Sequence, residues 1–79
     1  MDNTILHRIG RTVYLGEVPV LEIDSVDTMG NTRWALFRAL VPMRVDGAFV
    51  HPHSLASARS FDTILTWNGL FRLQQNHIL

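Results

Sequence analysis

The sequence predicts a small α+β domain, in which an antiparallel sheet of four to five strands, connected as a meander, packs one helix on one face. Two observations predict the sheet: an Asp-Gly pair between short apolar runs at 46–47, and a long alternating segment over 18–41. A third observation, an apolar stripe within residues 55–67, predicts the helix. Because the chain has 79 residues, we expect a single domain spanning 1–79.

The N-terminal segment predicts a first hairpin. Thr4–Ile9 and Thr12–Leu15 read as strands around Gly10-Arg11, and a pair that begins with glycine suits a type II′ turn. Ile5–Ile9, closed by Gly10, is also compatible with a single helical turn.

Residues 18–41 predict a second hairpin that turns through Thr28-Met29-Gly30, with Gly30 in the left-handed position of a three-residue loop. This turn pairs Asp27 with Asn31, Asp24 with Trp34, Ile23 with Ala35, Glu22 with Leu36, Leu21 with Phe37, and Val20 with Arg38. Pro19 cannot donate to a ladder, which indicates an edge strand or a bulge there.

A helix over residues 32–41 is the alternative for the second half of this hairpin. Arg, Ala and Leu favour helices, and Thr32 is a suitable N-cap. Such a helix would be apolar nearly all round, and Pro42 follows it directly, so we favour a strand.

The strongest local signal is the segment Met43–Val50. Asp46-Gly47 is typical of a type I′ turn, in which both central residues have positive φ. The turn pairs Val45 with Ala48, Arg44 with Phe49, and Met43 with Val50.

The predicted helix runs from Leu55 to Trp67, with Ser54 as its N-cap and Asn68-Gly69 as its stop. Its apolar stripe consists of Leu55, Ala58, Phe61, Leu65 and Ile64. Weak alternation over 70–79 predicts a terminal strand.

Alternation along the two longer hairpins sorts their residues onto two faces. The uncharged face, which we expect to form the core under the helix, holds Leu21, Ile23, Ala35, Phe37, Ala39, Val41, Met43, Val45, Ala48 and Val50. The opposite face mixes large apolar side chains with both signs of charge and holds Val20, Glu22, Asp24, Trp34, Leu36, Arg38, Leu40, Arg44, Phe49 and His51.

Composition predicts that some apolar surface stays uncovered in a monomer. Hydrophobic residues make up 47% of the chain and charged residues 18%, and a chain of this length buries only part of its surface. All seven cationic residues are arginine. One explanation is a GC-rich genome; the alternative is that the planar guanidinium suits bidentate, partly buried contacts. The net charge of zero argues against a dedicated duplex DNA binder, and residues 17–27 form an acidic segment.

These features predict a non-enzymatic protein-binding module that acts through the mixed face, because one helix cannot cover both faces of a sheet. The partner is either a second copy, most simply as a dimer, or a target protein that the chain inhibits or otherwise binds. The predicted contact residues are Glu22, Asp24, Trp34, Leu36, Arg38, Leu40, Arg44, Phe49 and His51. Folding of residues 1–15 or 70–79 over this face is the alternative.

Two other binding chemistries compete with this prediction. One face carries a set of residues that resembles a stacking platform for single-stranded nucleic acid: Trp34, Phe49, Arg38, Arg44 and His51. Glu22 and Asp24 on the same face, however, repel phosphates. His51-Pro52-His53 has the i, i+2 spacing of two metal ligands on a strand, but no third ligand is defined.

Catalysis and cofactors are not expected. The serines near the histidines lack a nucleophile elbow and an oxyanion loop, and the chain has no cysteine. No signal peptide or membrane span is recognisable, so we expect a cytoplasmic protein.

Overall fold

The part of the chain that the structure describes is built from strands alone. The computed structural model describes residues 6–61, 63–66 and 72–74. Its strands are β1 (Leu6–Ile9), β2 (Thr12–Leu15), β3 (Val18–Met29), β4 (Thr32–Ala39), β5 (Met43–Val45), β6 (Ala48–Val50), β7 (Leu55–Ala58), β8 (Thr63–Thr66) and β9 (Arg72–Gln74). Within these residues there is no helix of any length, and hence none that could cross a membrane. The predicted α+β class is therefore wrong.

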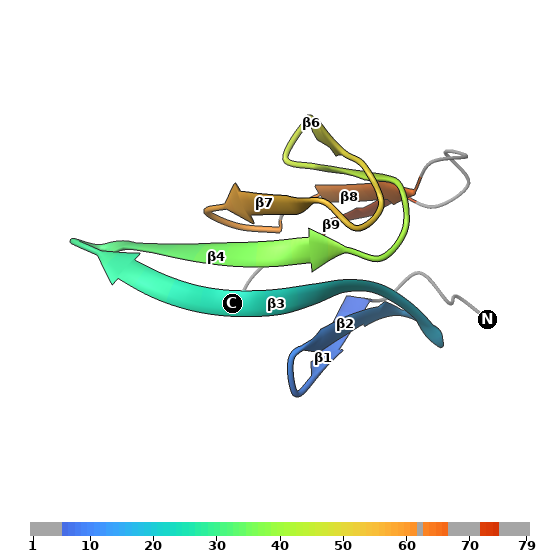
Figure 1. The fold of residues 1–79 in the computed structure, drawn as a ribbon, viewed down its shortest axis with the longest axis horizontal. Helices are drawn as coiled ribbons and strands as arrows, with labels where there is room; N and C mark the ends of the chain where they lie inside the picture. Colours follow the sequence, from blue (N-terminus) through green and yellow to red (C-terminus); the bar gives the residue numbers. More distant parts are fainter. Residues whose placement is uncertain (1–5, 62, 67–71, 75–79) are drawn as a thin grey trace.

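The strands form two antiparallel sheets rather than one meander. The first has the order β1-β2-β3-β4-β7 and the second β6-β5-β8-β9. Figure 1 shows the long hairpin of β3 and β4 between the β1–β2 hairpin and the strands of the second sheet. The chain leaves the first sheet after β4, returns to it for β7, and leaves again for β8, so the two sheets are linked by three crossings.

Two hairpins form as predicted. Gly10-Arg11 joins β1 to β2, with Ile9 opposite Thr12, and Gly10 has a φ of +61°. Asp46-Gly47 joins β5 to β6 in the predicted register, from Val45 opposite Ala48 to Met43 opposite Val50. Both Asp46 and Gly47 have positive φ, at +51° and +84°, as a type I′ turn requires.

The β3–β4 hairpin forms, but its turn is two residues long instead of three. Gly30-Asn31 connects Met29 to Thr32, and Gly30 has a φ of +62°. Positive φ at the first central residue alone is the type II′ pattern. Residues 32–39 are a strand, so the helical alternative for this segment is excluded.

Residues 55–66 form two strands where the sequence predicted a helix over 55–67. β7 pairs with β4, from Ala58 opposite Ala35 to Leu55 opposite Arg38. β8 pairs with β5, with Ile64 opposite Val45. A helix here would leave one edge of β4 and one edge of β5 open, so tertiary pairing overrides the helical pattern. The predicted stop, Asn68-Gly69, lies outside the described residues.

A second sheet, and not a helix, covers the uncharged face. Eight of its ten predicted members are buried, and Val41 packs against them, whereas Ala48 beside the turn is exposed. Phe61 and Ile64, two members of the predicted helical stripe, are also buried. The core therefore lies between the inner faces of the two sheets.

Two bulges in β3 alter the alternation of its side chains. The register with β2 shifts around Val20, next to Pro19, which confirms the bulge that the proline indicated. Val20 and Leu21 are consequently both buried, at 1% and 0% exposure. Val20, which simple alternation placed on the mixed face, belongs to the core.

Candidate functional site: the outer face of β3, β4 and β7

The second bulge in β3 decides which side chains meet on the outer face of the first sheet. Between Ile23 and Ser25 the register with β4 shifts by one residue, and Asp24 is the extra residue. Glu22 therefore lies opposite Arg38 and Asp27 opposite Trp34. The predicted partners of these residues were wrong, because the turn is one residue shorter and the bulge was not foreseen.

The side chains that point away from the core on these strands form three rows across the sheet. We call this surface the outer face; it consists of Glu22, Ser25, Asp27, Trp34, Leu36, Arg38, Leu55, Ser57 and Arg59, all of which are exposed. The first two rows are Glu22–Arg38–Leu55 and Ser25–Leu36–Ser57. The third row is Asp27–Trp34–Arg59, in which Arg59 follows the last residue of β7.

Three large apolar side chains are neighbours on this surface. Trp34 is 37% exposed, Leu36 is 36% exposed and Leu55 is 50% exposed. Trp34 and Leu36 are successive outward residues of β4, and Leu55 is the diagonal neighbour of Leu36 on β7. We call these three residues on β4 and β7 the apolar strip.

Arginines flank the apolar strip at both ends. The Arg59 guanidinium carbon lies 6.0 Å from the centre of the Trp34 ring, within range of a cation–π interaction. Arg38 donates a 2.8 Å hydrogen bond from Nη1 to the carbonyl oxygen of His53, in the loop after β6. The acidic residues of the face, Glu22 and Asp27, lie on β3, on the other side of the strip.

The structure brings together only part of the predicted contact set. Glu22, Trp34, Leu36 and Arg38 share the outer face, with Asp24 at the bulge beside them. Leu40 is half-buried just beyond β4.

The other predicted contact residues belong to the neighbouring β5–β6 hairpin or follow it. Arg44 pairs with Phe49 in the second sheet. The rings of Phe49 and His51 meet edge to face, with centroids 4.5 Å apart. The predicted single mixed face is therefore divided between two sheets.

Leu55, Ser57 and Arg59 were not predicted as surface partners, because residues 55–67 were assigned to a helix. Their alternation with Ala56, which is half-buried, and Ala58, which is buried, has a period of two. That period is typical of a strand with one face covered, and it is the signal that would have identified them.

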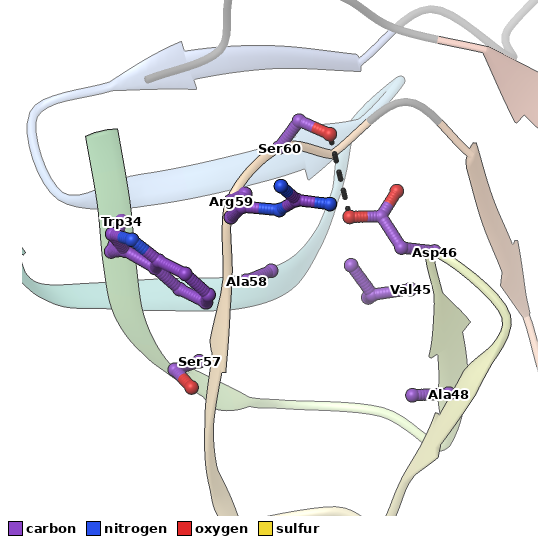
Figure 2. A pocket seen from close by; sticks show the side chains of 8 residues that line it. All are labelled: Trp34, Val45, Asp46, Ala48, Ser57, Ala58, Arg59 and Ser60. Atoms are coloured by element: carbon purple, nitrogen blue, oxygen red, sulfur yellow. Dashed lines mark hydrogen bonds between the residues drawn. The ribbon is translucent and has the colours of Figure 1, made fainter. Parts of the chain in front are cut away.

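A hollow of about 510 Å³ adjoins the outer face where β7 meets the β5–β6 hairpin. Figure 2 shows Arg59 directed toward Asp46 across this hollow, with Trp34 on its far side. The Ser60 hydroxyl donates a long hydrogen bond of 3.4 Å to Oδ2 of Asp46. The polar groups of the hollow suit hydrogen bonding to a partner, and its small residues, Ala48 and Ala58, keep it open.

Comparison with known proteins gives no family. No protein-family model, no curated protein and no solved structure matches this chain. The function must therefore be inferred from the geometry of its own residues.

The histidine pair does not form a recognisable metal centre. His53 has a φ of +66°, so the backbone at this residue is not extended, and the i, i+2 argument for two parallel ligands does not hold. Over residues 6–61, 63–66 and 72–74, no group of three His, Cys, Asp or Glu residues is placed to hold a metal ion.

Proposed function

We propose that this chain is a non-enzymatic protein-binding module and that the outer face of β3, β4 and β7 is its docking surface. The apolar strip of Trp34, Leu36 and Leu55 is the observation that carries the proposal. Large apolar side chains that cluster on a surface mark interaction sites more often than single ones do. Trp and Arg are also the residue types most enriched among the residues that dominate binding energy.

The chain's own described segments do not supply the missing cover. Covering of the face by residues 1–15 or 70–79 was the alternative in the sequence. Residues 6–15 form β1 and β2, which extend the first sheet beyond β3 instead of crossing its outer face. Residues 72–74 form β9 of the second sheet. Residues 1–5, 70–71 and 75–79 lie outside the described residues, so it is the described parts of both segments that favour an external partner.

Binding of single-stranded nucleic acid has weaker support. The aromatic platform that the sequence placed on one face is divided, with Trp34 on the first sheet and Phe49 on the second. Glu22 and Asp27 stand in the same rows as Arg38 and Trp34, where their carboxylates oppose phosphate binding. A protein surface accepts both signs of charge, so it fits the outer face better.

Site-specific photo-crosslinking in the cell that produces the protein tests the proposal. A photoreactive phenylalanine analogue replaces Leu36 on the outer face, and in a control it replaces Ile9, which is 63% exposed on β1. We expect a covalent adduct with an intact protein chain from position 36 and none from position 9, with the captured chain identified by mass spectrometry. Two outcomes would contradict a docking role for the outer face. In one, every adduct is intramolecular and no second protein chain is captured; in the other, positions 36 and 9 give equal amounts of adduct.

A further inference from the structure

We infer that the partner of the outer face is a second copy of this chain, packed face to face about a two-fold axis that runs parallel to β4 near Leu36. This inference rests on the proposed function and names its partner. Sheets that stack through such faces form the interior of β-sandwiches, and a two-fold interface uses the same surface on both copies.

The order of charges across the strands supports this axis. In the third row, Asp27 stands on β3, Trp34 on β4, and Arg59 beyond the end of β7. Rotation by half a turn about an axis along β4 places β3 of one copy over β7 of the other. Asp27 of one copy then faces Arg59 of the other, and the same contact occurs a second time by symmetry.

Two of the three residues of the apolar strip meet their own counterparts in this arrangement, whereas Leu55 on β7 lies opposite Glu22 of the second copy. The axis passes along β4, so Leu36 faces Leu36 and Trp34 faces Trp34 of the second copy. Removal of these exposed side chains from water provides the non-directional part of the association energy. The two charge contacts fix the register and exclude other arrangements.

The other in-plane axis, perpendicular to the strands, is disfavoured by the same charges. Rotation about an axis through the middle row, Ser25–Leu36–Ser57, exchanges the first row with the third. Asp27 would then face Glu22 of the second copy, and two carboxylates would oppose each other twice. Like charges brought together across an interface are unfavourable, so the axis along β4 is selected.

Arg38 is the one residue of like charge that lies near the chosen axis. Its guanidinium is already held by the 2.8 Å hydrogen bond to the carbonyl oxygen of His53, in the loop between β6 and β7. Glu22 also lies directly opposite it on β3. The hydrogen bond holds the guanidinium at this loop, and the carboxylate on the neighbouring strand lowers the repulsion between the two copies of Arg38. The net charge of zero means that the two copies do not repel each other as whole molecules.

Charge exchange between the two sides of the strip tests this arrangement. Asp27→Arg alone places one arginine against another at both symmetric contacts of its homodimer, and Arg59→Asp alone places one aspartate against another at both.

 In a mixture of the two variants, both contacts of the mixed dimer join opposite charges. One chain then carries arginine at positions 27 and 59, and the other carries aspartate at both. Sedimentation equilibrium of the purified chains over a range of concentrations measures each association.

We expect the wild-type chain to dimerise, each single variant to associate at least about tenfold more weakly, and the mixture to recover affinity close to that of the wild type. Arg33→Asp is the matched control, because it makes the same charge change at an exposed residue of β4 that is not on the outer face. We expect it to leave the dimer unchanged. Circular dichroism checks that each variant is folded. If one of the charge variants does not fold, Leu36→Asp is used in its place, and we expect it to abolish the dimer.

The outcomes separate this inference from the proposed function. A wild-type chain that stays monomeric at all concentrations overturns the second copy as partner, whereas a crosslink from position 36 to a different protein would still support a docking surface. A wild-type dimer that Leu36→Asp leaves intact overturns the use of the outer face. A dimer that both charge variants weaken, but that their mixture does not restore, overturns the axis along β4.

Discussion

The rings of Phe37 and Phe61 meet edge to face in the core, with centroids 5.2 Å apart and planes at 87°. Phe37 belongs to β4 of the first sheet, and Phe61 lies in the connection between β7 and β8, where the chain passes from one sheet to the other. Both side chains are 1% exposed. This contact therefore packs the β7–β8 connection against the first sheet, which carries the outer face.

Replacement of Phe61 by alanine should lower the free energy of unfolding by about 3–5 kcal/mol, because it leaves a cavity beside Phe37 and removes a favourable ring pair. Phe61→Leu keeps much of the volume and should cost clearly less. Urea denaturation of both variants measures the difference. A loss smaller than that of an ordinary surface substitution would contradict the burial of this ring.

The bulge at Val20 makes a prediction that simple alternation does not. Val20→Thr introduces a hydroxyl at a buried position and should cost about 1–3 kcal/mol. Val18→Thr makes the same chemical change at a residue that is 54% exposed, and it should alter stability by less than about 0.5 kcal/mol. Thermal denaturation of the pair tests the bulge, and equal effects at both positions would show that β3 is not bulged there.

The parts of the fold that the sequence predicted correctly depend on short-range rules. Asp46-Gly47 defines its hairpin because few residue pairs adopt positive φ twice in succession. Alternation then assigns the buried residues of the neighbouring strands, and Phe37 and Val45 are buried as expected. On the outer face, the same rule identified Trp34 and Leu36.

The errors arise where pairing over long distances decides the structure. Residues 55–66 have helical spacing of apolar groups, but open strand edges at β4 and β5 bind them as β7 and β8. The extra residues at Val20 and Asp24 each reverse the side of the sheet to which the following side chains of β3 point. A single sequence does not reliably indicate where such a bulge occurs. Leu55 and Arg59 were missed for the first reason. The partner of Glu22 was wrong because of the bulge at Asp24 together with the different position and length of the β3–β4 turn.

The type I′ turn provides a test of backbone strain without steric overlap. Gly47 has a φ of +84°, and a Cβ atom added to it would have no neighbour within 4 Å. Gly47→Ala should therefore destabilise the protein by about 1 kcal/mol through conformation alone. Gly47→Asn should cost less, because asparagine visits the left-handed region more readily. Thermal denaturation should rank the stabilities as Gly, then Asn, then Ala; a different order would contradict the turn.

Zinc should not stabilise the protein through His51 and His53. The positive φ of His53 removes the extended geometry that would present two imidazoles side by side. A ligand that binds only the folded state raises the unfolding temperature, so differential scanning fluorimetry with added zinc measures any such site. A rise in the unfolding temperature that the His51→Ala variant abolishes would show that the histidines do bind metal.

Single-stranded nucleic acid should bind weakly or not at all, even at low salt. The chain has no net positive charge, and the carboxylates of Glu22 and Asp27 occupy the rows that contain Arg38 and Trp34. A basic groove that neutralises phosphates binds with an affinity that falls steeply as salt is added.

Fluorescence anisotropy of a labelled oligothymidylate, titrated with the protein at low and at physiological salt, measures this directly. Strong binding at low salt that weakens with added salt and that Trp34→Ala removes would favour the nucleic-acid alternative.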